Sequence, residues 1–132
     1  MEKWSEAFEG MIPEDIYQLE IVNGEETGLI VKLFGKSSQV VFKFGIVLAV
    51  RMFDEGIVQS DVYSDKEIKK FRETNFQNVI YNVHGGEFCR KVVEMASGYL
   101  DDVNVKQYVL ITRNYNLDII TEFEPDIEVV EL

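Results

Sequence analysis

The stretch QVVFKFGIVLAVRMF, residues 39–53, constrains the fold of this chain more than any other segment. β-Branched and aromatic residues dominate it, and these residue types are enriched in β-strands. The run is too long for one straight strand, because most strands have about five or six residues. We expect Gly45 to mark a bulge or bend, since glycine weakens a strand interior but fits such kinks. The run therefore predicts the centre of an antiparallel meander.

Further strands are predicted on both sides of this run. Residues 16–22 alternate polar and apolar side chains, which is typical of a half-buried strand, and the turn-rich NGEETG connects them to a second strand at 29–35. Residues 78–86 read as a short strand ended by two glycines, and 105–125 supply two strands around the turn sequence RNYN. The final residues, 126–132, are predicted to be either an edge strand or a docked tail.

Helical spacing is clearest in GEFCRKVVEMASGYL, residues 86–100, which predicts one amphipathic helix. A capping-box pattern, Ser64 followed by Glu67, predicts a short helix over 65–75, and another short helical turn is expected around Trp4 and Phe8. Strands, helices and strands follow one another along the chain. We therefore predict an α+β fold, with an antiparallel sheet of about five to six strands, one main amphipathic helix and one or two short helices.

The size and composition predict a single soluble domain, residues 1–132. Cys89 is the only cysteine, so an intramolecular disulfide is excluded. The acidic N-terminal sequence has no apolar segment of a signal peptide, and no apolar run reaches the roughly 20 residues of a membrane span. We expect a cytoplasmic protein without membrane contact.

Negative charge is concentrated at both ends of the chain. The net charge is −11; residues 1–30 hold eight acidic residues and one basic one, and residues 101–132 hold eight and two. Nucleic-acid binding is disfavoured, because phosphate contacts need clustered lysine and arginine. A basic protein partner would be steered toward such a surface, although acidic domains are also common simply because charge favours solubility.

Residues for catalysis are sparse. His84 is the only histidine, so a catalytic triad or a multi-histidine metal site would depend on it alone. Cys89 has apolar neighbours that predict packing, not reactivity. The GKSS sequence lacks the preceding glycine of a phosphate-binding loop, because Ile30 stands there. We expect no enzyme activity, no catalytic residues and no cofactor.

The carboxylates of the C-terminal segment are the candidate site. Alternate residues of a strand share a face, so these acids could line one edge, opposite an apolar side made by Ile119, Phe123, Ile127 and Val129. A hard cation would accept such ligands, but the spacing of a known calcium loop is absent, and a solvated acidic face is favoured over a metal site. Tyrosine is a common interface anchor, which makes the RNYN turn a second candidate contact. The residues predicted to bind a partner are Asp118, Glu122, Glu124, Asp126, Glu128 and Tyr115.

Three segments carry a resemblance to a known group of proteins. They are NVIYNVHGGEFCRKVVEMASGYL, QYVLITRNYNLDIITEFEP and VVFKFGIVLAVRMFDEG, which together cover about half of the chain. These segments resemble small bacterial proteins of largely uncharacterised families, some of which are immunity proteins that block a toxin by binding it. The chain has Gln107 where such proteins often have histidine, and the resemblance transfers no catalytic residue.

The acidic surface, the lack of a catalytic constellation and the resemblance together predict a non-enzymatic binding protein. Its acidic strands would face a basic partner such as a toxin domain. Two alternatives stay open. One is a small-ligand or metal-binding enzyme built around His84, Cys89 and the terminal carboxylates. The other is a homo-oligomerising structural module whose exposed strand edge pairs with another copy, since the sequence does not give the oligomeric state.

Overall fold

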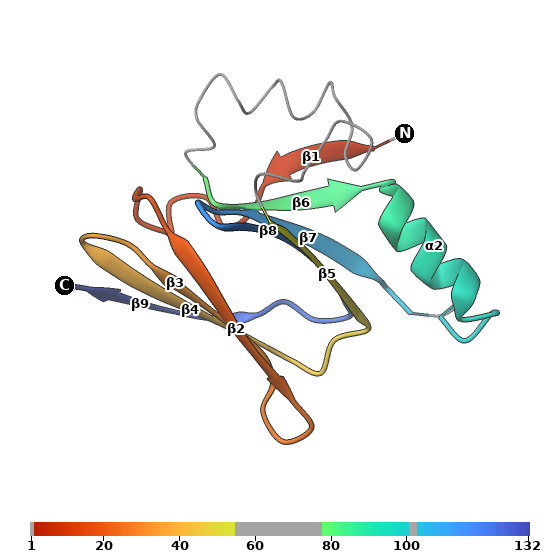
Figure 1. The fold of residues 1–132 in the computed structure, drawn as a ribbon. Coiled ribbons are helices and arrows are strands. Elements are labelled where there is room, and N and C mark those ends of the chain that lie inside the picture. The colour runs from red at the N-terminus through yellow and green to blue at the C-terminus, as the bar shows by residue number, and fades with distance from the viewer. Residues whose placement is uncertain (1, 55–77, 101–102) are drawn as a thin grey trace.

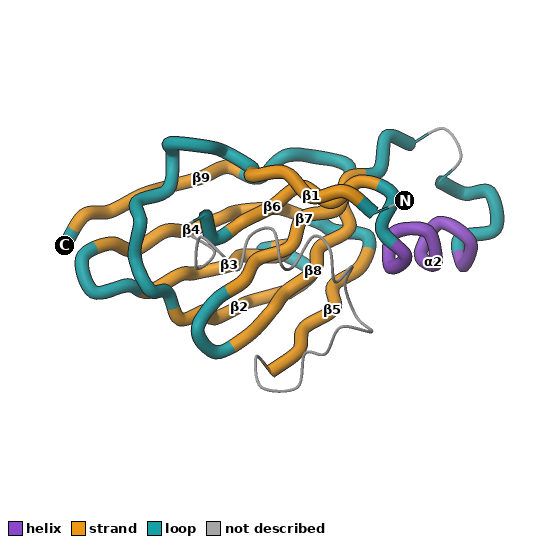
Figure 2. The backbone as a smooth tube through the Cα atoms, turned by 90° about the horizontal axis from the view of Figure 1, so that it is seen from above, coloured by secondary structure: helices purple, strands orange, loops and turns teal. Residues whose placement is uncertain are grey.

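A computed structural model describes residues 2–54, 78–100 and 103–132. Within these ranges the chain forms nine strands in two antiparallel sheets, with a single short helix (Figures 1 and 2). The five-stranded sheet has the order β1 (Lys3–Glu6), β6 (Ile80–His84), β7 (Lys106–Ile111), β8 (Tyr115–Thr121), β5 (Ala49–Asp54). The four-stranded sheet has the order β2 (Gln18–Gly24), β3 (Gly28–Phe34), β4 (Ser38–Gly45), β9 (Asp126–Glu131).

The inner faces of the two sheets share one hydrophobic core. Val31 and Leu33 of β3 are fully buried there, as is Leu117 of β8. Phe44 of β4 and Tyr108 of β7 meet across the two layers, with their ring centroids 5.9 Å apart. Side chains of a strand alternate between its two faces, so every second residue of these strands enters the core.

The outer face of the five-stranded sheet is buried as well. Trp4 of β1 and Tyr81 of β6 pack on that face with their rings tilted and the ring centroids 5.7 Å apart, and Trp4 Nε1 donates a hydrogen bond to Glu2 Oε2 at 3.1 Å. Val109 and Ile120 are fully buried there too. A sheet buried on both faces needs apolar residues at successive positions, which explains why β7 and β8 lack a clean two-residue alternation.

The run 39–53 divides at Gly45, as predicted from the sequence. Gly45 has a φ of 72°, and the β3–β4 register shifts between Leu29 and Ile30, which is a β-bulge. Gly28, with a φ of 64°, lies so close that a Cβ atom there would come within 2.3 Å of the Gly45 carbonyl carbon. The prediction of one meander is wrong, because β5 leaves the four-stranded sheet and pairs with β8 (Figure 1).

The predicted α+β fold class is wrong, because packing of sheet on sheet forms the core. The helix α2 (Glu87–Met95) is present but has no buried residue, and it lies at one end of the five-stranded sheet (Figure 1). The helix was predicted to reach residue 100, but α2 ends at Met95. Ser97 and Gly98, which follow it, both take positive φ angles. In the described part of the chain, no helix is both long and apolar enough to cross a membrane.

Two predicted short helices have different outcomes. The helix expected over 65–75 lies outside the described residues. The helical turn around Trp4 is wrong, because Lys3–Glu6 forms β1 and pairs with β6, with Trp4 opposite Val83. Phe8 follows that strand in a left-handed conformation, with a φ of 53°, so its i, i+4 spacing from Trp4 does not reflect a helix.

Candidate functional site

The carboxylates predicted to form one surface lie in two separate parts of the structure. Asp118 is in the middle of β8 and is 0% exposed, because that strand has neighbours on both sides and is buried on both faces. Glu122 and Glu124 lie in the connection from β8 to β9, and Asp126 and Glu128 lie on β9 itself. Asp118 therefore does not share a face with the other acids, and it cannot contact a partner directly.

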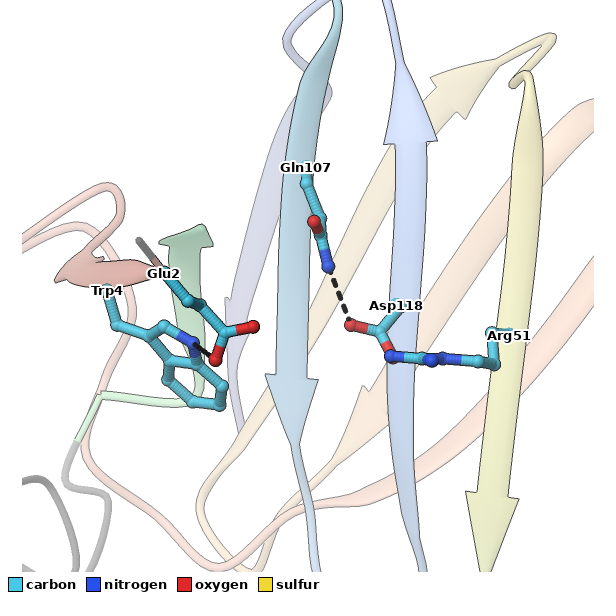
Figure 3. Close-up of polar contacts among 5 residues, drawn as sticks. All are labelled: Glu2, Trp4, Arg51, Gln107 and Asp118. Atoms are coloured by element: carbon cyan, nitrogen blue, oxygen red, sulfur yellow. Dashed lines mark hydrogen bonds and ion pairs between the residues drawn. The ribbon is translucent and has the colours of Figure 1, made fainter. Parts of the chain in front are cut away.

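Asp118 is the middle member of a buried polar row across three neighbouring strands (Figure 3). Arg51 of β5 places Nε and Nη2 each 3.0 Å from Asp118 Oδ2, and Gln107 of β7 donates from Nε2 to Asp118 Oδ1 at 3.1 Å. Both carboxylate oxygens thus accept charge-assisted or amide hydrogen bonds, which a buried carboxylate requires. The row ties β5, β8 and β7 together through side chains as well as through the backbone ladder.

Arg51 also connects the sheet to α2. Its guanidinium carbon lies 4.4 Å from the ring centroid of Phe88 on α2 and 5.4 Å from that of Phe53 on β5. Both distances are within the range of a cation–π interaction. The Arg51 side chain keeps 26% of its surface exposed, so it spans from the buried carboxylate to solvent. Because α2 has no buried residue, this contact helps to hold the helix against the sheet.

Two buried oxygen atoms, Gln107 Oε1 of the row and Asn116 Oδ1 of β8, have no hydrogen-bond partner among the described residues. A Cβ atom at Gly86 would come within 2.4 Å of Gln107 Oε1, so a larger residue at the start of α2 would displace that amide. The row offers an ion pair and, with Asn116, two free acceptors, but none of these side chains is a nucleophile. Among the described residues, no group of three or more histidine, cysteine or acidic side chains could hold a metal ion.

His84 and Cys89, the two other residues considered for chemistry, lie at the end of β6 and in α2. His84 is exposed. Cys89 is half-buried, and burial raises the pKa of its thiol above the ordinary value. A raised pKa leaves less reactive thiolate at neutral pH, which is the opposite of what a nucleophilic cysteine needs.

The remaining acids lie in a segment that we call the β9 strip, residues 122–132. Exposed apolar side chains accompany them: Phe123 is 65% exposed and Val130 is 44% exposed. The predicted apolar side is therefore wrong at Phe123, because residues 122–125 cross between the sheets and break the strand alternation. Its acidic residues are Glu122, Glu124, Asp126, Glu128 and Glu131, of which all but Glu122 are exposed.

Two lysines contact the β9 strip in the described part of the chain. Lys106 Nζ donates to the backbone oxygen of Glu122 at 3.0 Å. Lys43 Nζ is 3.8 Å from Glu128 Oε2, and both side chains are more than half exposed. Such a surface pair is screened by water and contributes little to stability, on the order of 0–1 kcal/mol. Glu128 therefore remains accessible to another cation.

The backbone of β9 forms a free edge of the four-stranded sheet. Leu132 N donates to Ser37 O at 2.8 Å, which makes these two residues a hydrogen-bonded pair at the end of the β4–β9 ladder. Hydrogen-bonded and non-hydrogen-bonded pairs alternate along an antiparallel ladder. The residues whose backbone groups point away from β4 are Ile127, Val129 and Glu131. In the described part of the chain, no strand pairs with that edge.

The opposite edge, on β2, is covered at its beginning, at Tyr17 and Leu19, by the turn between β7 and β8. Arg113 N donates to Tyr17 O at 2.9 Å; Asn114 accepts from Leu19 N at 2.8 Å and donates to Leu19 O at 3.1 Å. At Leu19 the Asn114 amide thus takes the place of a neighbouring strand. Tyr115 was predicted as a partner contact in this turn. Its side chain is half-buried and packs against the core of its own chain. The RNYN turn joins the two sheets of its own chain.

Sequence reasoning missed the partners of Asp118. The signal was present, because Arg51 and Asp118 are single charges within the apolar runs GIVLAVRMF and NLDII. A charge in a buried strand needs an opposite charge or hydrogen bonds, so two such residues predict a pair. The role of Asn114 had no comparable signal, because asparagine in a turn is expected for local reasons.

Comparisons with known proteins find no family model, no curated protein and no solved structure that matches this chain. The resemblance to immunity-type proteins therefore stays a prediction.

Proposed function

We propose that this chain is a non-enzymatic binding protein that neutralises a basic protein, such as a bacterial toxin domain, by holding it on the β9 strip. The observation that carries the proposal is the combination in one short segment of exposed carboxylates, exposed apolar side chains and a free strand edge. Interfaces need apolar contact for affinity and complementary charge for partner choice.

Electrostatics supports a basic partner. The net charge is −11, and the last 32 residues hold eight acidic and only two basic residues. One of those acids, Asp118, is neutralised internally by Arg51. A surface of this sign accelerates the approach of a positively charged protein, and the acceleration decreases as salt is added.

Removing two charges from the β9 strip should weaken binding. We expect the double variant Asp126→Asn/Glu128→Gln to bind its partner about tenfold more weakly at low salt, because rim charges mainly steer association. The matched control is Glu25→Gln/Glu26→Gln, which removes two exposed charges from the β2–β3 turn and should change affinity less than about twofold. Surface plasmon resonance at two salt concentrations measures both effects.

The partner for this measurement is obtained by affinity capture from the cells that make the chain, followed by purification. Co-expression then tests neutralisation: the chain should restore growth of cells that the partner alone arrests. A captured partner that is acidic, or one that binds both double variants equally well, would contradict the proposal. A basic partner whose activity the chain does not inhibit would contradict the neutralising role.

A further inference from the structure

We infer that the partner binds by strand addition: an extended segment that alternates basic and apolar residues pairs antiparallel with β9 and becomes the fifth strand of the four-stranded sheet. This inference rests on the proposed function, because it specifies how the β9 strip holds its partner. It concerns the backbone of β9 as well as its charges.

The backbone of β9 has hydrogen-bonding groups that can pair with an added strand. Ile127, Val129 and Glu131 direct their N–H and C=O groups to the free edge, as the alternation from the Leu132–Ser37 pair requires. The edge on β2 is already occupied at Tyr17 and Leu19 by Asn114 and the neighbouring turn. Among the described residues no strand pairs with the outer edge of β9, so β9 is the edge of this sheet that better accepts a strand. Edge strands with unpaired backbone groups are templates for pairing with another chain.

The acidic side chains of β9 favour basic residues in the added strand. Asp126 and Glu128 hydrogen-bond to β4, so in a ladder with an added strand they occupy the non-hydrogen-bonded positions. At these positions the Cβ atoms of facing residues are about 4.5–5.5 Å apart. Lysine or arginine opposite Asp126 and Glu128 would therefore form cross-strand ion pairs on the outer face of the sheet.

The residues that alternate with these acids, Ile127 and Val129, determine where the added segment is apolar. Ile127 and Val129 point to the inner face, where Ile127 packs against the core and Val129 is 37% exposed. An apolar residue opposite each of them would extend the core and cover Val129. The added segment must therefore alternate basic and apolar residues.

A second copy of this chain fits the edge poorly. Antiparallel pairing of two β9 strands would bring Asp126 and Glu128 of both copies onto one outer face. In the register centred on Glu128 the two Glu128 carboxylates would lie opposite each other, and like charges at facing positions are destabilising. The acids of β9 thus disfavour self-pairing while favouring a basic strand. This makes a heterologous partner a better occupant than a homodimer.

Val129→Pro tests the backbone contribution directly. Proline removes the N–H that points to the free edge and none that bonds to β4, and proline is tolerated on edge strands. We expect Val129→Pro to weaken binding at least about tenfold, while Val129→Ala, which keeps the N–H, weakens it less than about threefold. Circular dichroism melting of both variants confirms that the fold is intact.

The probe is a synthetic octapeptide of alternating lysine and valine, titrated into the full chain and followed by NMR. The control peptide has the same composition with four lysines followed by four valines, so its charge is equal but its alternation is lost. The alternating peptide should bind at least about tenfold more tightly, with the shift changes centred on β9.

Different results would contradict strand addition and the proposed binding of a basic partner. Equal binding of both peptides, with no loss in Val129→Pro, would overturn strand addition even if Asp126→Asn/Glu128→Gln still weakened binding. An alternating peptide that produces no shift change on β9 at millimolar concentration would also overturn it. A charge double variant that binds the natural partner as well as the unaltered chain does would instead contradict the proposed function.

Discussion

Asp118→Asn should lower the free energy of unfolding by about 3 kcal/mol, because it removes one partner of a buried ion pair. The change keeps the size of the side chain, so it leaves no cavity. It removes the charge that compensates Arg51 and sets an amide against the amide of Gln107. The expected loss is at the low end of the range for buried pairs, since Arg51 remains 26% exposed and can recover some hydration. Urea unfolding measures it.

The control for this prediction is Glu128→Gln. Glu128 faces Lys43 at 3.8 Å, but both side chains are exposed, so the expected loss is below about 1 kcal/mol. If Asp118→Asn lowers the free energy of unfolding by no more than Glu128→Gln does, the polar row does not stabilise the five-stranded sheet.

Gly28→Ala should also lower the free energy of unfolding by about 3 kcal/mol. The positive φ of Gly28, 64°, costs an L-residue about 1–2 kcal/mol. In addition, the new Cβ atom would lie 2.3 Å from the backbone of Gly45, which cannot rotate away as a side chain can. The β3–β4 bulge would have to open. This would also disturb the segment after Gly45, where the chain leaves the four-stranded sheet.

Two other glycines separate these causes. Gly10 has a φ of 77° but open space around its Cβ position, so Gly10→Ala should cost only about 1 kcal/mol for the backbone conformation. Gly24→Ala meets nothing nearer than Thr27 Oγ1 at 3.5 Å, and a change below about 0.5 kcal/mol is expected. If Gly28→Ala lowers the free energy of unfolding by no more than Gly10→Ala does, the close approach of Gly28 to Gly45 does not add to the destabilisation. Thermal or urea unfolding of the three variants measures this series.

Local sequence patterns were enough to predict several elements. The alternation at 16–22 corresponds to β2, the bend at Gly45 separates β4 from β5, and the spacing after Gly86 corresponds to α2. These features depend on neighbouring residues, on the allowed φ angles of glycine and on side-chain periodicity. The overestimate of the helix arose because amphipathic spacing shows which face is apolar but not how large a surface covers it.

The sheet assignment could not be predicted in the same way. β4 and β5 are consecutive along the chain but join different sheets, and so do β8 and β9. That choice depends on contacts between distant segments, such as Arg51 with Asp118, 67 positions apart. Of the acids named from the sequence, those of β9 are exposed, whereas Asp118 belongs to a buried row that only the pairing of β5 with β8 creates.

Amide hydrogen exchange along β9 tests the central claim most directly. In the free chain, the amides of Ile127 and Val129 should exchange fast, because they point to the free edge, while those of Glu128 and Val130 should be protected by β4. On addition of the alternating lysine–valine peptide, the amides of Ile127 and Val129 should become protected as well. If these two amides are already protected in the free chain, or stay unprotected in the complex, β9 is not the edge that receives the partner.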